Sequence, residues 1–271
     1  MNNMEIIQAI FLGIIEGLTE FLPISSTGHL IVAQDAINYY DATKLFTVFI
    51  QIGAIAAVIW FYRRALWQLV VGLVTGDKKA RRFWIIWVVA TIPAGIAGLA
   101  LDAQIEAYAL TTTVAIALII GGIIIWLVET YHAVQPAKSA HLDTITLKQA
   151  VQIGLYQTLA LIPGVSRSGA TIIGGMLSGV DRVTATAFSF YLSIPVIVLA
   201  GLYKLATGDT QSVEGGSAAL IAGTVAAFMS ALIVIKWLLR YVSGHDLKIF
   251  AYYRIIFGIL LLVLVGMGVL G

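Results

Sequence analysis

Two short stretches of this sequence concentrate the groups that could do chemistry. The first, EGLTEFLPISSTGHL at residues 16–30, holds two carboxylates, several hydroxyls and a histidine. The second, PGVSRSGAT at residues 163–171, holds one arginine among hydroxyl side chains. Both interrupt strongly apolar surroundings, where an ionisable group is costly and usually belongs to a functional site.

Glu16 and Glu20 are one helical turn apart, and so lie on one face of a helix. Two carboxylates this close repel each other in an apolar setting unless a cation lies between them. The sequence allows two candidates for this cation. One is Arg167, the only cation inside either stretch; the other is a divalent metal ion, Mg²⁺ or Ca²⁺, with Glu16 and Glu20 as its ligands.

The second stretch has the groups that bind phosphate. The planar fork of Arg167 suits bidentate contact with phosphate oxygens, and Ser166, Ser168 and Thr171 offer hydroxyl donors. Both stretches run from a proline through small hydroxyl residues to a glycine, so each should begin a new helix whose N–H groups point into the gap. Two such cradles facing each other suit a doubly charged head group on a membrane-embedded tail.

The composition places the whole chain in a membrane. Of 271 residues, 60% are hydrophobic and only 11% charged, which is too little polar material to coat a soluble protein of this size. The absence of cysteine excludes disulfides, thiolate metal sites and cysteine nucleophiles. We therefore predict an all-α polytopic membrane protein that forms a single membrane domain over residues 1–271.

Six apolar stretches are long enough to span the bilayer. They cover approximately residues 45–62, 83–101, 111–128, 185–205, 218–239 and 250–270. Segments 6–37 and 147–180 are instead broken by proline, glycine and hydroxyl residues, and their arms are too short to cross about 30 Å of hydrocarbon. We predict that each forms a re-entrant helical hairpin.

The order of hairpin and three spans occurs twice, which predicts two repeats, at about 1–133 and 147–271, with a boundary near 134–146. Aligning Glu16 with Gln157 also aligns Gly28 with Gly169. Because three spans per half is an odd number, the second repeat must be inverted, and the two hairpins should meet tip to tip near the midplane.

Basic residues indicate the orientation. With the N-terminus outside, only Lys44 and Lys204 fall outside, and most tryptophans fall near the inner boundary. The inner residues are Arg63, Arg64, Lys78, Lys79, Arg81, Arg82, Lys138, Lys148, Arg182, Arg240 and Lys248, with Lys236 and Arg254 just within spans. This bias predicts that both termini lie on the outer side of the membrane.

The two motifs together resemble those of the undecaprenyl-pyrophosphate phosphatases, the bacterial bacitracin-resistance proteins, and the similarity of length and segment order covers essentially the whole chain. This resemblance implies removal of the terminal phosphate of undecaprenyl pyrophosphate, which recycles the lipid carrier for peptidoglycan synthesis. It places the protein in the bacterial plasma membrane, with the site opening on the outer side. It also implies two interlocked inverted repeats. The family's functional positions fall on Glu16, Glu20, Ser25, Ser26, His29 and Arg167.

For the reaction we expect Ser26 to attack the terminal phosphorus, with Glu20 or His29 accepting its proton. Attack by a water activated by the two glutamates remains the alternative. The residues expected to bind substrate are Ser25, Thr27, Gly28, Gln157, Ser166, Ser168, Gly169 and Thr171.

Other residues are expected to be structural. His132, His141 and His245 fall in inner loops and should be solvated. Asp181-Arg182 should be loop charge or a helix start. Gly95, Gly98, Gly121 and Gly122 lack charged neighbours and should permit close helix packing.

Inverted repeats with broken helices also build transporters, so a transporter or flippase of an anionic or polyprenyl-phosphate substrate is the main alternative. A purely structural scaffold would leave the buried charges without a role. The Ser26, His29 and Glu20 grouping favours the enzyme. The expected partners are a polyprenyl pyrophosphate and membrane lipids, and not nucleic acid; a homodimer is left open.

Overall fold

A computed structural model describes residues 3–39, 41, 44–101, 104–105, 110–132, 139–207 and 216–270, and within these the chain is helical with no strand. Lys138 and residues 134–137 of the expected repeat boundary lie outside the described residues. The α-helices are α1 (Asn3–Thr19), α2 (Ser26–Ala36), α3 (Leu45–Phe61), α4 (Arg63–Thr75), α5 (Lys78–Ala100), α7 (Thr111–Tyr131), α8 (Leu147–Thr158), α9 (Arg167–Leu177), α10 (Arg182–Thr207), α11 (Gly216–Val242) and α12 (Lys248–Gly266), with short 3₁₀ turns η1 (Leu142–Thr144) and η2 (Leu159–Leu161).

Five of the described helices are long and apolar enough to cross a membrane, namely α5, α7, α10, α11 and α12. A sixth span forms if α3 and α4, which meet at a 73° bend, count as one. Many large apolar side chains on these helices are exposed, as they must be where the solvent is lipid. The predicted multi-pass, all-α membrane protein is confirmed.

Helix α4 was not predicted, because we took the residues before position 83 for an inner loop. The mean hydropathy of this helix is lowered by Arg63, Arg64 and Gln68. It also carries apolar side chains that are exposed, such as Trp67 at 68% and Val74 at 83%. An amphipathic helix of this kind is typical of the membrane interface, where a hydropathy pattern tuned to spanning segments misses it. Helix α5 accordingly begins at Lys78, before the expected start.

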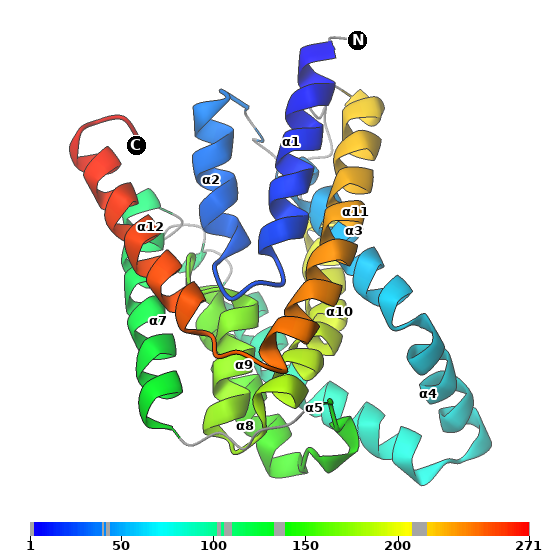
Figure 1. The fold of residues 1–271 in the computed structure, drawn as a ribbon. Helices are drawn as coiled ribbons and strands as arrows, with labels where there is room; N and C mark the ends of the chain where they lie inside the picture. Colours follow the sequence, from blue (N-terminus) through cyan, green and yellow to red (C-terminus); the bar gives the residue numbers. More distant parts are fainter. Residues whose placement is uncertain are drawn as a thin grey trace.

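The two broken segments form two helical hairpins that approach each other (Figure 1). Helices α1 and α2 join through a turn around Pro23, and α8 and α9 join through η2 and the Pro163-Gly164 turn, where Gly164 has φ of 95°. Proline cannot continue either first arm, and only glycine adopts this φ without strain. The tips touch, because Ser168 Oγ donates to the Leu22 carbonyl at 2.8 Å.

Small residues set the packing around the hairpins. A side chain at Gly13 or Gly17 of α1 would collide with the backbone of α11, and one at Gly154 of α8 would lie 2.7 Å from the Ala90 carbonyl of α5. Each hairpin therefore packs closely on a helix distant in sequence, as small residues allow in membranes.

The glycines that we assigned to packing divide into two pairs. Gly121 and Gly122 of α7 do lie tightly against α12, as predicted. For Gly95 and Gly98 the packing prediction was wrong. A Cβ at Gly95 would meet nothing within 4 Å, and one at Gly98 would meet only the end of the Leu161 side chain, at 3.5 Å. These two glycines face open space.

At the end of the molecule where α7 ends and α10 and α12 begin, a buried carboxylate joins three helices. Glu129 pairs with Arg182 and also accepts from the Leu247 N–H at 2.9 Å. Asp181 accepts from the Thr184 N–H at 2.8 Å, which makes it a cap at the start of α10, one of the two roles expected.

Of the three inner-loop histidines, His141 and His245 are exposed as expected. His132 is a correction, because it is only partly exposed and its Nε2 lies 3.0 Å from the Met176 carbonyl, next to the end of α9.

Candidate active site

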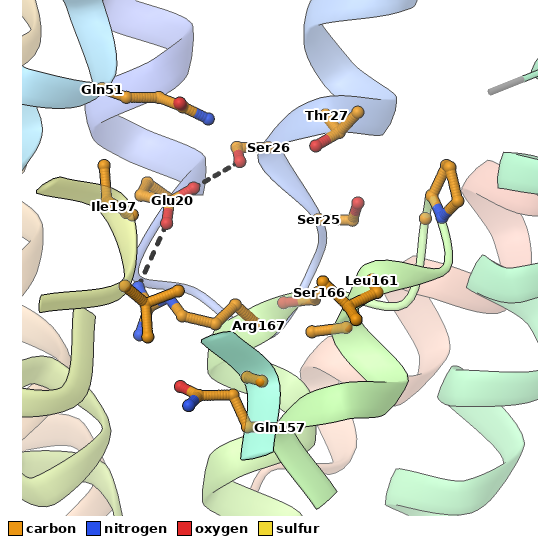
Figure 2. Close-up of a pocket in the computed structure, with 15 residues that line it drawn as sticks. Glu20, Ser25, Ser26, Thr27, Gln51, Gln157, Leu161, Ser166, Arg167 and Ile197 are labelled. Carbon is orange, nitrogen blue, oxygen red and sulfur yellow. Dashed lines mark hydrogen bonds and ion pairs between the residues drawn. The ribbon is translucent and has the colours of Figure 1, made fainter. Parts of the chain in front are cut away.

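A cavity of about 190 Å³ lies where the two hairpin tips meet (Figure 2). Its polar lining residues are Glu20, Ser25, Ser26, Thr27, Gln51, Gln157, Ser166 and Arg167. The remaining lining residues are Ala94, Ala160, Leu161, Pro163, Gly164, Val196 and Ile197. The cavity thus joins both sequence motifs, although they lie far apart in the chain.

Glu20 connects the two motifs directly. Its Oε1 forms an ion pair with Arg167 Nη2 at 3.1 Å, and its Oε2 accepts a hydrogen bond of 2.5 Å from Ser26 Oγ (Figure 2). Glu20 and Ser26 are buried, and the Arg167 side chain is only 10% exposed. The carboxylate is therefore placed to draw the proton from the Ser26 hydroxyl, while the guanidinium stays beside it.

Arg167 is held from a second side by α10, a contact that sequence reasoning missed. Its Nη1 donates to the Ser189 carbonyl at 2.9 Å, and Thr171 Oγ1 donates to or accepts from Ser189 Oγ at 2.6 Å. Ser189 is itself completely buried. The buried hydroxyls of Ser189 and Ser193, four residues apart in an apolar span, were the signal that could have revealed this role.

Ser25 and Ser166 occupy matching positions at the starts of α2 and α9. Ser25 has φ of 71° and Ser166 has φ of 74°, a region that residues other than glycine rarely adopt. Each side chain caps its helix by accepting an N–H group, from Gly28 at 3.5 Å and from Gly169 at 3.1 Å. Those two N–H groups are thus already bonded.

The first N–H groups of each helix remain to make an anion cradle. They belong to Ser26 and Thr27 in α2 and to Arg167 and Ser168 in α9, and they have no acceptor within their own helix. Because the dipoles of both helices point their positive ends at the cavity, an anion there is favoured from two sides.

Several predicted site residues do not line the cavity. Three of them, Gly28, Gly169 and Thr171, lie near the starts of α2 and α9 but outside the cavity lining. The hydroxyl of Ser168 donates to the Leu22 carbonyl and lies 3.0 Å from Ser166 Oγ. His29 lies on the opposite face of α2. Its Nδ1 is 2.8 Å from the Ser25 carbonyl and its Nε2 is 2.6 Å from the Tyr253 hydroxyl. The ring also stacks on Phe257.

Four buried polar atoms at or near the cavity lack a hydrogen-bond partner among the described residues. Two of them are the carboxylate oxygens of Glu16, a predicted site residue that is fully buried and does not line the cavity. The other two, Gln157 Oε1 and Arg167 Nε, belong to residues that do line it. Gln157 otherwise donates to the Ala90 carbonyl at 3.3 Å. Buried polar atoms without partners are costly, and a bound ligand is one way to supply the missing contacts.

The Glu16 oxygens also test the expected metal ion. Carboxylate oxygens are the ligands that Mg²⁺ and Ca²⁺ prefer, and Glu16 sits one turn before Glu20, whose N–H donates to the Glu16 carbonyl at 2.9 Å. No cluster of three or more candidate ligands occurs among the described residues. The donor set therefore fits a divalent ion only if substrate oxygens complete the coordination.

Arg254 is the largest functional correction. Its charge was counted as an orientation signal, but its side chain is fully buried and makes five hydrogen bonds to backbone carbonyls. The acceptors include Pro23 at 3.1 Å in one tip and Val165 at 2.9 Å and Gly164 at 3.1 Å in the other. The other two acceptors are Ala117 and Leu118 of α7. Arg254 therefore fastens both hairpin tips to one point.

Gln51 was also missed. It lies on α3 and lines the cavity near Ser26 (Figure 2). A polar amide inside the otherwise apolar stretch 45–61 was the available signal.

The fold and the cavity define a multi-pass membrane protein with a polar cavity between two helical hairpins. A sequence model of the family described as bacitracin resistance protein BacA matches residues 9–260. This chain belongs to that family.

Curated relatives match nearly the full length. The chain is 47% identical over 264 residues to "Undecaprenyl-diphosphatase 3" of Acinetobacter baylyi, covering 97% of this chain and 98% of the relative. It is 48% identical over 271 residues to "Undecaprenyl-diphosphatase 1" of Burkholderia lata, with 98% and 97% covered. It is also 47% identical over 267 residues to "Undecaprenyl-diphosphatase" of Methylobacillus flagellatus, with 97% and 98% covered.

Proposed function

We propose that this protein is an integral membrane phosphatase that hydrolyses undecaprenyl pyrophosphate to undecaprenyl phosphate and inorganic phosphate. This activity recycles the lipid carrier of cell-wall synthesis and confers resistance to bacitracin. The proposal rests on the names of the near full-length relatives and on one observation, the Ser26–Glu20–Arg167 hydrogen-bond chain in a cavity faced by two helix starts.

The bond between Ser26 and Glu20 suggests the order of events. Glu20 accepts the hydroxyl proton as Ser26 Oγ forms a bond to the terminal phosphorus. The anhydride P–O bond then breaks, and its electron pair stays on the polyprenyl phosphate that leaves. A water molecule then forms a bond to the phosphorus of the phosphoserine, and the bond between Ser26 Oγ and phosphorus breaks. Its electron pair stays on Oγ, Glu20 returns its proton to Oγ, and the inorganic phosphate leaves with the oxygen and protons of the water. Arg167 and the helix-start N–H groups offset the negative charge throughout.

His29 has another role in this scheme. Because its two ring nitrogens lie against the Ser25 carbonyl and the Tyr253 hydroxyl, we assign it to holding the start of α2 and not to proton transfer. Ser168 is likewise assigned to joining the tips, through its bond to the Leu22 carbonyl. The alternative mechanism is direct attack by water, with Glu20 as the base. A search for phosphoserine distinguishes the two mechanisms, because direct attack forms none.

A divalent ion belongs to the proposal as a partner of the pyrophosphate. Glu16 and Glu20 would hold it, and the charge that it supplies would help to neutralise the phosphate oxygens. The unpartnered Glu16 oxygens are the observation that favours it. Mg²⁺ or Ca²⁺ suits these ligands.

For the topology we propose six spans, two re-entrant hairpins and two inverted repeats, at about 1–133 and 147–271. The matching φ angles of Ser25 and Ser166 support the repeat, as does the exchange of partners in which α1 packs on α11 and α8 packs on α5. The start of α1 and the end of α12 lie at one end of the molecule, and α4, with its arginines, lies toward the other (Figure 1). This arrangement supports a plasma-membrane orientation with both termini and the site opening outside.

The decisive experiment measures inorganic phosphate released from undecaprenyl pyrophosphate by the purified protein in detergent. We expect multiple turnovers per protein molecule. Transport of the lipid phosphate across proteoliposomes without any release of inorganic phosphate would instead establish the transporter alternative.

A further inference from the structure

A second, mainly apolar cavity lies next to the polar one. It has a volume of about 290 Å³ and lies between α5 and α10. Ala94, Leu161 and Val196 line both cavities, so the two lie side by side. Its other walls include Gly95, Gly98 and Ala200, and its lining is mainly apolar, with Thr91, Tyr203 and Lys204 as the exceptions.

The structure also explains why a cavity forms here. At one end Trp87 Nε1 holds the two helices together by donating to the Tyr191 carbonyl at 2.8 Å. Further along, each helix carries an internal proline, Pro93 in α5 and Pro195 in α10. A proline inside a helix removes a hydrogen bond and favours a kink, so the helices are free to diverge beyond this point.

Glycine keeps the cavity open. Any side chain at Gly95 or Gly98 would extend into the space between the helices, since neither position has a neighbour closer than 3.5 Å. A glycine inside a helix costs about 1 kcal/mol relative to alanine, so two glycines without a packing role need another explanation. The rim of the cavity reaches lipid, because Leu99 and Leu199 are 64% and 53% exposed.

We propose that this cavity seats the first part of the isoprenoid tail whose pyrophosphate occupies the polar cavity. The inference rests on the proposed function and names the place of the tail. At roughly 30 Å³ for each water-sized group, the cavity has room for on the order of ten non-hydrogen atoms, which is about two isoprene units. The rest of the tail passes between Leu99 and Leu199 into the bilayer.

The seat acts by orientation and not by hydrophobic attraction. A tail that moves from lipid into an apolar cavity gains little, since lipid is already apolar. What the cavity supplies is a fixed exit direction, so that the terminal phosphorus faces Ser26 while the chain leaves sideways. Leu161, which lines both spaces, separates head group from tail.

The first test is photocrosslinking in the full-length protein. A farnesyl pyrophosphate analogue that carries a photoreactive group on its tail should label residues 95–99 and 196–200, as located by mass spectrometry. Excess undecaprenyl phosphate should suppress the label, and excess phosphatidylglycerol should not. Labelling suppressed equally by phosphatidylglycerol would identify an ordinary lipid site and overturn the proposal. Labelling at Thr113 or Thr158, which line another apolar cavity, would do the same.

The second test fills the cavity. Gly98→Leu and Gly95→Leu should lower kcat/KM for undecaprenyl pyrophosphate by about tenfold to a hundredfold, because a small misplacement of the reacting atom is enough for such a loss. The inhibition constant of isopentenyl pyrophosphate, whose short tail stays in the polar cavity, should change less than about twofold, a change of under 0.5 kcal/mol. The matched control is Gly266→Leu, which adds the same side chain to an open glycine of α12.

These results separate the two proposals. If the unmodified protein releases no phosphate, the proposed function fails, while competed labelling of residues 95–99 would still establish the tail seat. If phosphate is released normally by both leucine variants, the tail seat fails and the proposed function stands.

Discussion

The guanidinium of Arg254 occupies the space that a side chain at Gly121 would need. A Cβ at Gly121 would lie 2.7 Å from Arg254 Cζ, so α7 can carry only glycine at this level. From that position the five donors of the guanidinium reach carbonyls of both hairpin tips and of α7. The geometry of the site therefore depends on a residue that does not line the cavity.

The first prediction concerns this positioning residue. Arg254→Lys keeps the charge but offers three donors in place of five, so at least two buried carbonyls lose a partner. We expect the free energy of unfolding to fall by about 2–4 kcal/mol. We also expect kcat to fall at temperatures well below the variant's Tm, with a smaller change in KM, because the tips lose their alignment. Arg240→Lys, at an exposed position, is the control, and an unchanged kcat in Arg254→Lys would contradict the positioning role.

The second prediction concerns the base. Glu20→Gln keeps the shape of the side chain and an acceptor for Ser26, but removes the charge that takes the proton. Phosphate release should fall by about 100-fold or more, as expected for loss of a general base. The variant should still insert and purify as a monodisperse protein. Glu5→Gln, in the first turn of α1, the helix that ends just before Glu20, should match the unmodified protein. Turnover within a few-fold of normal in Glu20→Gln would remove Glu20 from the mechanism.

The third prediction concerns the nucleophile. Ser26→Ala should lower kcat on the order of a thousandfold or more, since losing a nucleophile disables the whole catalytic group. Acid quenching of the unmodified protein during turnover should leave phosphate on the peptide that contains Ser26, detected by mass spectrometry. Ser178→Ala removes a hydroxyl that bonds only to the end of α9, and should leave the rate unchanged. Substantial turnover by Ser26→Ala would favour direct attack by water.

The fourth prediction concerns the metal ion. Removal of divalent cations by a chelator should abolish phosphate release, and added Mg²⁺ or Ca²⁺ should restore it. Because Glu16 has two buried oxygens without a partner, Glu16→Gln should raise the cation concentration needed for half-maximal activity by about tenfold, a change of 1.4 kcal/mol. Full activity in the presence of excess chelator would exclude the ion from the reaction.

Much of the fold followed from local pattern. The hydrophobic stretches predicted α3, α5, α7, α10, α11 and α12 within a few residues, and the breaks predicted both hairpins. Helix α4 was missed because its composition is intermediate between loop and span. Gly95 and Gly98 were misassigned because a glycine that admits a neighbouring helix and a glycine that lines a cavity look alike in sequence.

The sequence predicted those site residues whose types are rare in membrane-embedded segments. It missed those whose types are common there. Glu20, Ser26 and Arg167 stood out because ionisable groups seldom occur at membrane depth, and they do meet. Ser189 and Gln51 did not stand out, since single polar residues in apolar helices have many uses. His29 illustrates the converse, because a motif residue can face away from the cavity that its neighbours line.

The sequence by itself determined that the protein is embedded in a membrane, that two of its apolar segments are interrupted, and which charged groups lie at the interruptions. Hydropathy, helix length and the cost of burying a charge depend on residues that are close together in the sequence. They can therefore be read from the order of the residues alone. Only the tertiary structure decided which atoms meet: that Arg167 pairs with Glu20, that Arg254 binds both hairpin tips, and that α5 and α10 line a mainly apolar cavity. Such contacts join residues far apart in the chain, and their geometry depends on how all the helices pack together.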